Sequence, residues 1–173
     1  MIQVFEIQNF SETFSDLVFP LCKEQNESKN MRFTKDIPTE WMPVVDKAKS
    51  VLEQKFVELT NLQRSCFDLF TAFVSVGKDY FMETHYDDKC FLMSGLFYFH
   101  SSNPNSGGLS FFESQSKEQI AEDSGKKILQ IYPEKNKLVY WINNKESYHK
   151  PDTVIGLRQT VYFGLMHPEI FAW

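Results

Sequence analysis

The sequence contains few cysteines, and their arrangement does not suggest cross-links. Cys22, Cys66 and Cys90 are odd in number, widely spaced and form no Cys-x-x-Cys pair. Disulfide frameworks and zinc–thiolate sites use paired, closely spaced cysteines. The sequence therefore argues against both, and we expect reduced thiols in a reducing compartment, with the cytoplasm as the default location.

Targeting segments and basic tracts are also missing. The first ten residues have no basic stretch ahead of an apolar one, and no apolar run approaches the roughly 20 residues of a membrane span. We therefore expect neither a signal peptide nor membrane association. The net charge is −5 and no run of Lys or Arg occurs. Nucleic-acid backbones are bound through clustered cations, so we do not expect nucleic acid as a partner.

Aromatic residues, by contrast, are abundant. They make up 16% of the 173 residues, and 17 of them are Phe. Large rings suit the wide interior of a β-sandwich or barrel. The length fits one domain with a substantial core, so we expect a single domain over residues 1–173. The sequence does not define an oligomeric state.

The N-terminal part has mainly helical patterns. Residues 2–7 alternate and predict a strand, whereas Ser11 begins a stretch of helical apolar spacing that ends near Leu21. Residues 26–38 are polar and irregular and predict a loop. The strongest helical periodicity covers residues 40–60. We therefore expect residues 1–65 to be mostly helical support that packs on the outside of a sheet.

From residue 66 the pattern becomes one of short β-prone segments. These segments are rich in aromatic and β-branched residues and are separated by turn signals. They cover residues 66–76, 80–87, 91–100, 109–113, 126–132, 137–142 and 158–166. Seven such segments predict an antiparallel sandwich or jelly roll over residues 66–166, which gives a mainly β fold with N-terminal helices.

A metal site is suggested by "HYD" at 85–87. Residues i and i+2 of a strand point to the same face, so His85 and Asp87 can aim at one point. A third ligand would complete a facial triad of the kind that binds non-haem Fe(II). His149 is the natural candidate because it follows an apolar strand, and His100 and His167 are the alternatives.

A carboxylate pocket is suggested nine residues after His149. Arg158 and Thr160 alternate on one face of the last predicted strand. An inward-facing Arg in an aromatic sandwich needs an anion, and its planar fork suits a carboxylate. The sequence therefore predicts a metal beside a carboxylate pocket.

The order of these motifs resembles the Fe(II)- and 2-oxoglutarate-dependent oxygenases, and within them the prolyl-4-hydroxylase-like branch. The matching segments are "HYD" at 85–87, "SGLFYFHSSNPNSGGLSFF" at 94–112, "IYPEKNKLVYWINNKESYHKP" at 131–151 and "GLRQTVYF" at 156–163. The resemblance covers roughly residues 70–166. It implies a double-stranded β-helix, which is a cupin-like jelly roll, flanked by α-helices.

The resemblance also implies roles for individual residues. His85, Asp87 and His149 would ligate Fe(II) and form the catalytic centre. The cosubstrate 2-oxoglutarate would chelate the metal through its 1-carboxylate and keto oxygen. Arg158 would pair with the distal carboxylate, helped by Thr160. Tyr98 matches a family tyrosine that reaches the same carboxylate, and the alternative is that Tyr98 is simply a core aromatic.

The implied reaction is O2-dependent decarboxylation of 2-oxoglutarate to succinate, coupled to hydroxylation of an unactivated C–H bond. The substrate would be a protein or peptide side chain such as proline, or a small molecule, with ascorbate as a reductant. Halogenating relatives carry Gly or Ala at the position of Asp87, so the carboxylate favours hydroxylation. Two alternatives stay open: a non-catalytic metal-binding jelly roll, and a cupin-type metalloenzyme that does not use 2-oxoglutarate.

Overall fold

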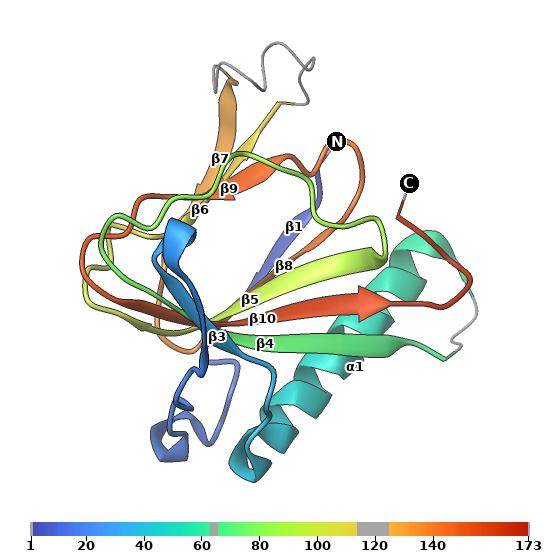
Figure 1. Ribbon diagram of the computed structural model, residues 1–173. Helices are drawn as coiled ribbons and strands as arrows, with labels where there is room; N and C mark the ends of the chain where they lie inside the picture. Colours follow the sequence, from blue (N-terminus) through green and yellow to red (C-terminus); the bar gives the residue numbers. More distant parts are fainter. Residues whose placement is uncertain (1, 63–65, 114–124, 173) are drawn as a thin grey trace.

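The protein is built from two antiparallel β-sheets and one α-helix, stacked as three layers (Figure 1). The computed structural model describes residues 2–62, 66–113 and 125–172. The large sheet has the strand order β1-β8-β5-β10-β4-β3-β2, and the small sheet has the order β7-β6-β9. The strands are β1 (Val4–Ile7), β2 (Glu24–Asn26), β3 (Met31–Thr34), β4 (Asp68–Val76), β5 (Phe91–Ser101), β6 (Leu109–Phe112), β7 (Lys127–Ile131), β8 (Lys137–Ile142), β9 (His149–Pro151) and β10 (Arg158–Met166). The helical segments are α1 (Met42–Thr60) and three 3₁₀ turns, Phe14–Asp16, Glu27–Lys29 and Thr39–Trp41.

The path of the chain between the sheets identifies the fold. After β5 in the large sheet, β6 and β7 form a hairpin in the small sheet, and β8 returns to the large one. The chain then crosses again to β9 and comes back as β10, which lies between β5 and β4. This alternation is the winding of a jelly roll, and it confirms the predicted fold class.

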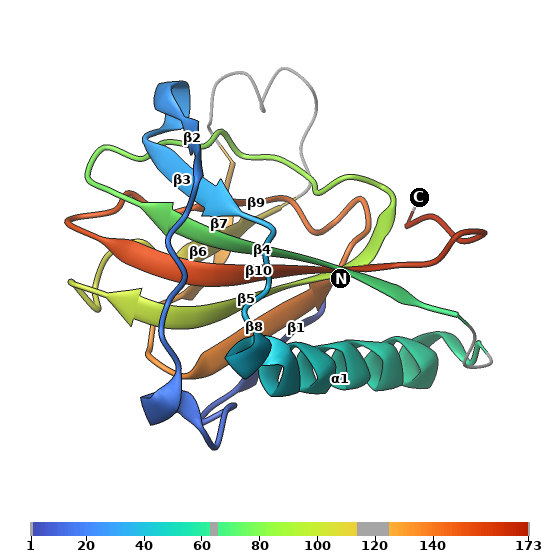
Figure 2. The same ribbon diagram turned by 60° about the horizontal axis from the view of Figure 1, so that its bottom comes forward.

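Helix α1 covers the outer face of the large sheet (Figure 2). It begins at Met42, with a proline in its first turn, where a missing backbone N–H costs nothing. One cluster of buried residues joins the helix to the sheet, with Trp41, Ala48 and Leu52 packed against residues such as Phe73 and Phe97. The predicted helix over residues 40–60 and its position outside a sheet are therefore confirmed.

Two N-terminal predictions are wrong. The stretch after Ser11 forms only the 3₁₀ turn Phe14–Asp16, because its apolar side chains do not share a buried face: Val18 is 68% exposed and Leu21 is 83% exposed. The carbonyl of Val18 instead accepts a hydrogen bond from the Trp41 indole, at 2.8 Å. A single α-helix is therefore found in the described N-terminal residues, where helices were expected.

The predicted loop at 26–38 is the second error. Asn30 takes a left-handed conformation, with φ of 47°, and allows the chain to turn between β2 and β3. Strand β3 then pairs with β4 and extends the large sheet. Because β4 lies more than 30 residues further along the chain, the local pattern of residues 26–38 could not indicate this pairing.

The segment predicted as a strand at residues 80–87 contributes one bridging residue. His85 exchanges two backbone hydrogen bonds with His149, at 2.8 and 2.9 Å, and thereby adds a single residue pair to the edge of the small sheet. The next possible ladder acceptor, the carbonyl of Glu83, faces the His85 ring nitrogen at 2.8 Å. The next pair in this register would join Glu83 to Pro151, which has no backbone N–H to donate, so a longer ladder does not form at this edge. The sequence also placed His149 at a strand end without predicting β9.

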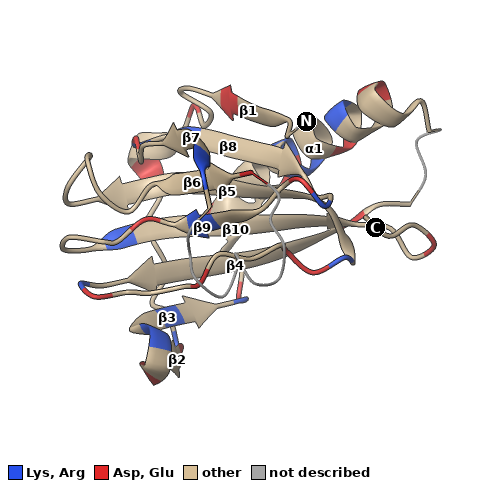
Figure 3. Cartoon of the chain, turned by 90° about the horizontal axis from the view of Figure 1, so that it is seen from above, with Lys and Arg blue, Asp and Glu red and all other residues tan. Residues whose placement is uncertain are grey.

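Charged residues lie mainly at strand ends and in loops. Seen from above, most of the length of β4, β5 and β8 is uncharged, and acidic and basic positions alternate around the periphery (Figure 3). None of the described helices combines the length and the apolarity that a bilayer crossing requires.

Candidate metal centre

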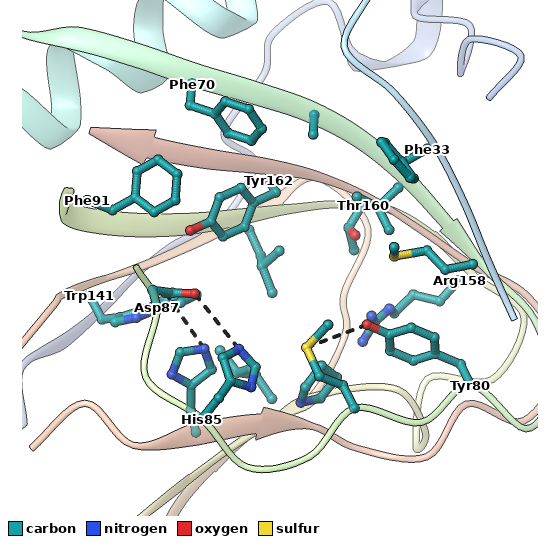
Figure 4. Close-up of a pocket in the computed structure, with 18 of the residues that line it drawn as sticks. Phe33, Phe70, Tyr80, His85, Asp87, Phe91, Trp141, Arg158, Thr160 and Tyr162 are labelled. Atoms are coloured by element: carbon teal, nitrogen blue, oxygen red, sulfur yellow. Dashed lines mark hydrogen bonds and ion pairs between the residues drawn. The ribbon is translucent and has the colours of Figure 1, made fainter. Parts of the chain in front are cut away.

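Two histidines and an aspartate converge between the sheets (Figure 4). The imidazole Nε2 of His85 lies 3.9 Å from Oδ1 of Asp87, and Nε2 of His149 lies 3.8 Å from Oδ2. One ligand atom from each residue lies within 4.8 Å of the other two. The backbone bridge between the two histidines places their rings on one face, with centroids 4.7 Å apart.

The ring nitrogens of both histidines are oriented for metal binding. Nδ1 of His85 lies 2.8 Å from the carbonyl of Glu83, and Nδ1 of His149 lies 2.7 Å from the carbonyl of Ser147. A carbonyl can only accept, so each Nδ1 carries a proton and donates, which leaves the Nε2 lone pairs facing Asp87. Burial lowers the pKa of His149, against the opposing effect of the Asp87 charge, and this favours the neutral imidazole that a metal requires.

The Asp87 carboxylate has few hydrogen-bond donors around it in the described part of the chain. Asp87 is largely buried, and its Oδ2 has no hydrogen-bond partner among the described residues. With both imidazoles neutral, their Nε2 lone pairs and the buried Asp87 carboxylate converge on one point as electron donors. This donor set fits a divalent metal with open coordination positions, of which Fe(II) is the usual example.

The two alternative histidines lie elsewhere. His100 is at the end of β5, where it borders a surface cleft with Phe14 and Gln159. The ring of His167 packs edge-on against Phe67, with centroids 5.4 Å apart. Neither belongs to the His-Asp-His cluster. The structure thus places His149 where the sequence favoured it, and its role as a ligand stays a prediction.

Arg158 is a buried cation for which the described part of the chain supplies no carboxylate partner. Its side chain is 3% exposed, and one guanidinium nitrogen donates to the carbonyl of Gly107 at 2.7 Å. Within the described ranges, Nε has no hydrogen-bond partner and no carboxylate forms an ion pair with the group. The ring of Tyr80 lies beneath the guanidinium, at 5.6 Å. A buried guanidinium with so few partners is costly unless a ligand supplies a negative charge.

Two hydroxyl groups accompany Arg158. Thr160, 1% exposed, lies two residues further along β10 and faces the same pocket. Tyr98 lies directly across from Thr160 on β5, and its hydroxyl is buried without a hydrogen-bond partner among the described residues. Burial raises the pKa of Tyr98 to about 12, so the group is a neutral donor at physiological pH. The Tyr98 ring packs in the core with Leu109 and Phe111, as expected of a core aromatic. Its hydroxyl lies across from Thr160, so the alternative role as a carboxylate contact stays a prediction.

A single pocket connects the metal cluster to Arg158. Its volume is about 340 Å³. Apart from these groups and Lys35, its walls are mostly apolar, and they come from β3, β4, β5, β6, β8, β9, β10 and the segment before His85. The apolar lining residues include Met31, Phe33, Phe70, Ala72, Val74, Met82, Phe91 and Leu96. The pocket can therefore hold a polar ligand at the Arg158 end and an apolar group near the metal cluster.

Sequence reasoning missed several of these lining residues. Met31 and Phe33 were assigned to a loop, although their alternation with the exposed Arg32 was a weak strand signal. Tyr162 was also missed, although the same alternation that paired Arg158 with Thr160 extends to it.

Solved structures with a similar fold are found for this chain, whereas sequence comparison finds no match. No family model and no curated protein matches the sequence. A solved structure of a viral collagen prolyl hydroxylase from Paramecium bursaria Chlorella virus 1, in a 2-oxoglutarate complex, has a TM-score of 0.65 at 14% identity and covers 96% of both chains. HygX from Streptomyces hygroscopicus, with nickel, 2-oxoglutarate and hygromycin B bound, has a TM-score of 0.62 at 12% identity over 98% of this chain and 85% of that one.

A third structure contains a peptide. A prolyl hydroxylase from Trichoplax adhaerens, in complex with a hypoxia inducible factor peptide fragment, has a TM-score of 0.60 at 12% identity, over 94% of this chain and 83% of that one. Likenesses of this extent, at identities this low, establish a shared fold. The chain has the fold of the 2-oxoglutarate- and Fe(II)-dependent oxygenases, in the form that prolyl hydroxylases adopt.

Proposed function

We propose that the protein is an Fe(II)- and 2-oxoglutarate-dependent oxygenase that hydroxylates an unactivated C–H bond. One observation carries the proposal: a His-Asp-His cluster shares a pocket with a buried guanidinium that has no carboxylate partner among the described residues. The metal cluster alone would suit many metalloproteins. The guanidinium adds a demand for an anionic group in the same pocket, such as the distal carboxylate of 2-oxoglutarate, and a cupin-type enzyme without that cosubstrate has no such demand.

Each group in the pocket has a defined task. His85, Asp87 and His149 would hold Fe(II) on one side and leave its remaining positions to ligands. When bound, Fe(II) and 2-oxoglutarate would supply the oxidation, in which O2, 2-oxoglutarate and R–H give succinate, CO2 and R–OH. Arg158 would donate hydrogen bonds to the distal carboxylate of 2-oxoglutarate, and the hydroxyl of Thr160 would donate to the same oxygens.

Tyr98 is a candidate for a third contact to that carboxylate. Its hydroxyl is buried on the same side of the sheet as Thr160, and it is a neutral donor at physiological pH. Burial of such a group without a partner costs free energy, so a ligand oxygen in reach would be favourable. We propose this contact for the loaded protein.

The walls limit which part of a substrate can approach the metal. Phe33, Phe70 and Phe91 present apolar surface, on which a charged or strongly hydrated group would be poorly solvated. We infer that the oxidised position lies on an apolar group, such as an aliphatic side chain, a proline ring or the hydrocarbon part of a small molecule. Peptides and small molecules both meet this condition. The cytoplasmic location and the use of ascorbate stay predictions.

The experiment that tests the proposal is an anaerobic absorption titration. Fe(II) is added to the metal-free protein, followed by 2-oxoglutarate. A weak visible charge-transfer band that needs both additions indicates that the 2-oxo acid chelates protein-bound iron. If Fe(II) binds to the folded protein and 2-oxoglutarate produces no band, the cosubstrate assignment is wrong, and a metal-binding jelly roll without this chemistry becomes the better description.

A further inference from the structure

The Asp87 carboxylate has two oxygens, and a metal with three protein ligands takes only one of them. The other oxygen then needs a hydrogen-bond donor, because a buried carboxylate oxygen without one is costly. Neither backbone N–H groups nor side chains supply a hydrogen bond to Oδ2 among the described residues. A donor that can turn toward this oxygen would complete the metal centre.

Tyr162 carries the hydroxyl that is placed for this task. It lies on β10 two residues after Thr160 and faces the pocket, and its hydroxyl end points toward the Asp87 carboxylate (Figure 4). The ring is held between two other aromatic rings, with centroids 6.1 Å from Phe70 and 5.8 Å from Phe91. The position of the hydroxyl is therefore set by packing and does not depend on a bound ligand.

A buried chain of hydrogen bonds determines where the Tyr162 proton points. Nδ2 of Asn143 donates to Oγ of Ser94 at 2.7 Å and to the carbonyl of Phe91 at 3.1 Å. Oγ of Ser94 lies 2.8 Å from the Tyr162 oxygen. The Asn143 NH2 group can only donate, so the serine oxygen accepts from it, and the Ser94 hydroxyl is placed to donate its own proton to the tyrosine oxygen. The Tyr162 proton is thus left free for Asp87.

We propose that Tyr162 is a positioning residue that donates a hydrogen bond to the Asp87 oxygen that does not ligate the metal. This inference rests on the proposed function. The hydrogen bond holds Asp87 as a ligand through one oxygen, so that the second oxygen cannot swing onto the metal and take a position needed by 2-oxoglutarate or O2.

The test replaces Tyr162 by Phe and follows metal binding instead of turnover. Tyr162→Phe keeps the ring and removes the donor. Tyr140→Phe is the matched control, because Tyr140 is a buried tyrosine on β8 whose ring packs toward α1 on the opposite face of the same sheet. Co(II) serves as the probe, with its affinity measured by chelator competition and its ligand field by visible absorption.

We expect Tyr162→Phe to weaken Co(II) binding about 10- to 100-fold, the usual cost of losing a group that orients a metal ligand. Tyr140→Phe should stay within about twofold of the wild type. The Co(II) visible bands of Tyr162→Phe should lose intensity, since a carboxylate that binds through both oxygens raises the coordination number. At saturating metal, Tyr162→Phe should also bind 2-oxoglutarate more weakly than the wild type, because the second Asp87 oxygen would compete for a metal position that the cosubstrate needs.

Unchanged Co(II) affinity and an unchanged spectrum in Tyr162→Phe would overturn the inference. If that variant does not fold, as judged by circular dichroism, Ser94→Ala takes its place. It removes the group that directs the Tyr162 proton and should weaken Co(II) binding in the same direction by a few-fold, and an unaltered affinity would again refute the role of the chain. A wild-type protein that binds no metal would contradict the proposed function itself, which separates the two failures.

Discussion

Replacing Arg158 by Met tests the carboxylate pocket and should have two effects of opposite sign. Methionine fills a similar volume without the charge. In the loaded protein the guanidinium is expected to face a carboxylate in a site where it is 3% exposed. Removing one partner of such a buried pair costs about 3 to 5 kcal/mol. The affinity for 2-oxoglutarate should therefore fall at least about 150-fold, since about 1.4 kcal/mol corresponds to a factor of ten.

The metal-free, ligand-free protein should respond in the other direction. There, the buried guanidinium bears a desolvation cost of several kcal/mol, and its hydrogen bond to the carbonyl of Gly107 returns about 1.5 to 3 kcal/mol. Arg158→Met removes both contributions. We expect the free energy of unfolding to rise by about 1 kcal/mol, measured by urea denaturation without ligand.

The assay combines two titrations on the same protein. Fe(II) binding is measured first and should change little, because Arg158 does not belong to the metal cluster. The dissociation constant of 2-oxoglutarate then follows from the visible band under anaerobic conditions. Arg32→Met is the matched control, because Arg32 lies on β3, beyond β4 in the same sheet, and has an exposed side chain; it should leave both constants unchanged. An unaltered 2-oxoglutarate affinity in Arg158→Met would refute the assignment of this pocket.

Four further predictions concern the metal, the reaction, the response to pH and the helix. His149→Ala should abolish Fe(II) binding, whereas His100→Ala should not, and an isothermal titration that gives the reverse result would reassign the third ligand. Asp87→Ala should destroy hydroxylation, measured as product formed per succinate released, and full activity would contradict the triad. Burial raises the pKa of Tyr98 to about 12, above the value of about 10 in the unfolded state, so the free energy of unfolding should fall by at most about 3 kcal/mol between about pH 10 and 12. Tyr98→Phe should remove that loss when urea unfolding is measured as a function of pH. An unchanged pH dependence in the variant would contradict the burial of the hydroxyl. Leu52→Ala should lower the free energy of unfolding by about 2 to 5 kcal/mol, because its fully buried side chain joins α1 to the large sheet, and a smaller loss would mean that the helix repacks.

The sequence predicted the parts of the site that follow local periodicity. The two-residue spacing of His85 and Asp87, and of Arg158 and Thr160, places each pair on one face whatever the partners are. The elements that failed depend on partners far along the chain. Strand β3 exists because β4 supplies an edge for it, and β9 pairs along its length with β6.

Helical spacing misled in one place for a related reason. The apolar residues after Ser11 have the period of a helix, but Leu21 and Val18 have no core to enter, because the large sheet is already covered by α1. Tyr162 was missed because an aromatic residue in a jelly-roll strand is usually core. Its polar role depends on Ser94 and Asn143, which meet it only in the folded protein.

The central position of β10 has a consequence for how the chain can fold during synthesis. Strands β4 and β5 do not pair with each other, since β10 lies between them and bonds to both. Until residues 158–166 have left the ribosome, the β3–β4 and β5–β8 pairs remain separate halves with apolar faces open to solvent. Joining them closes contacts across a large part of the chain, which makes the step slow and leaves the nascent protein dependent on protection from aggregation.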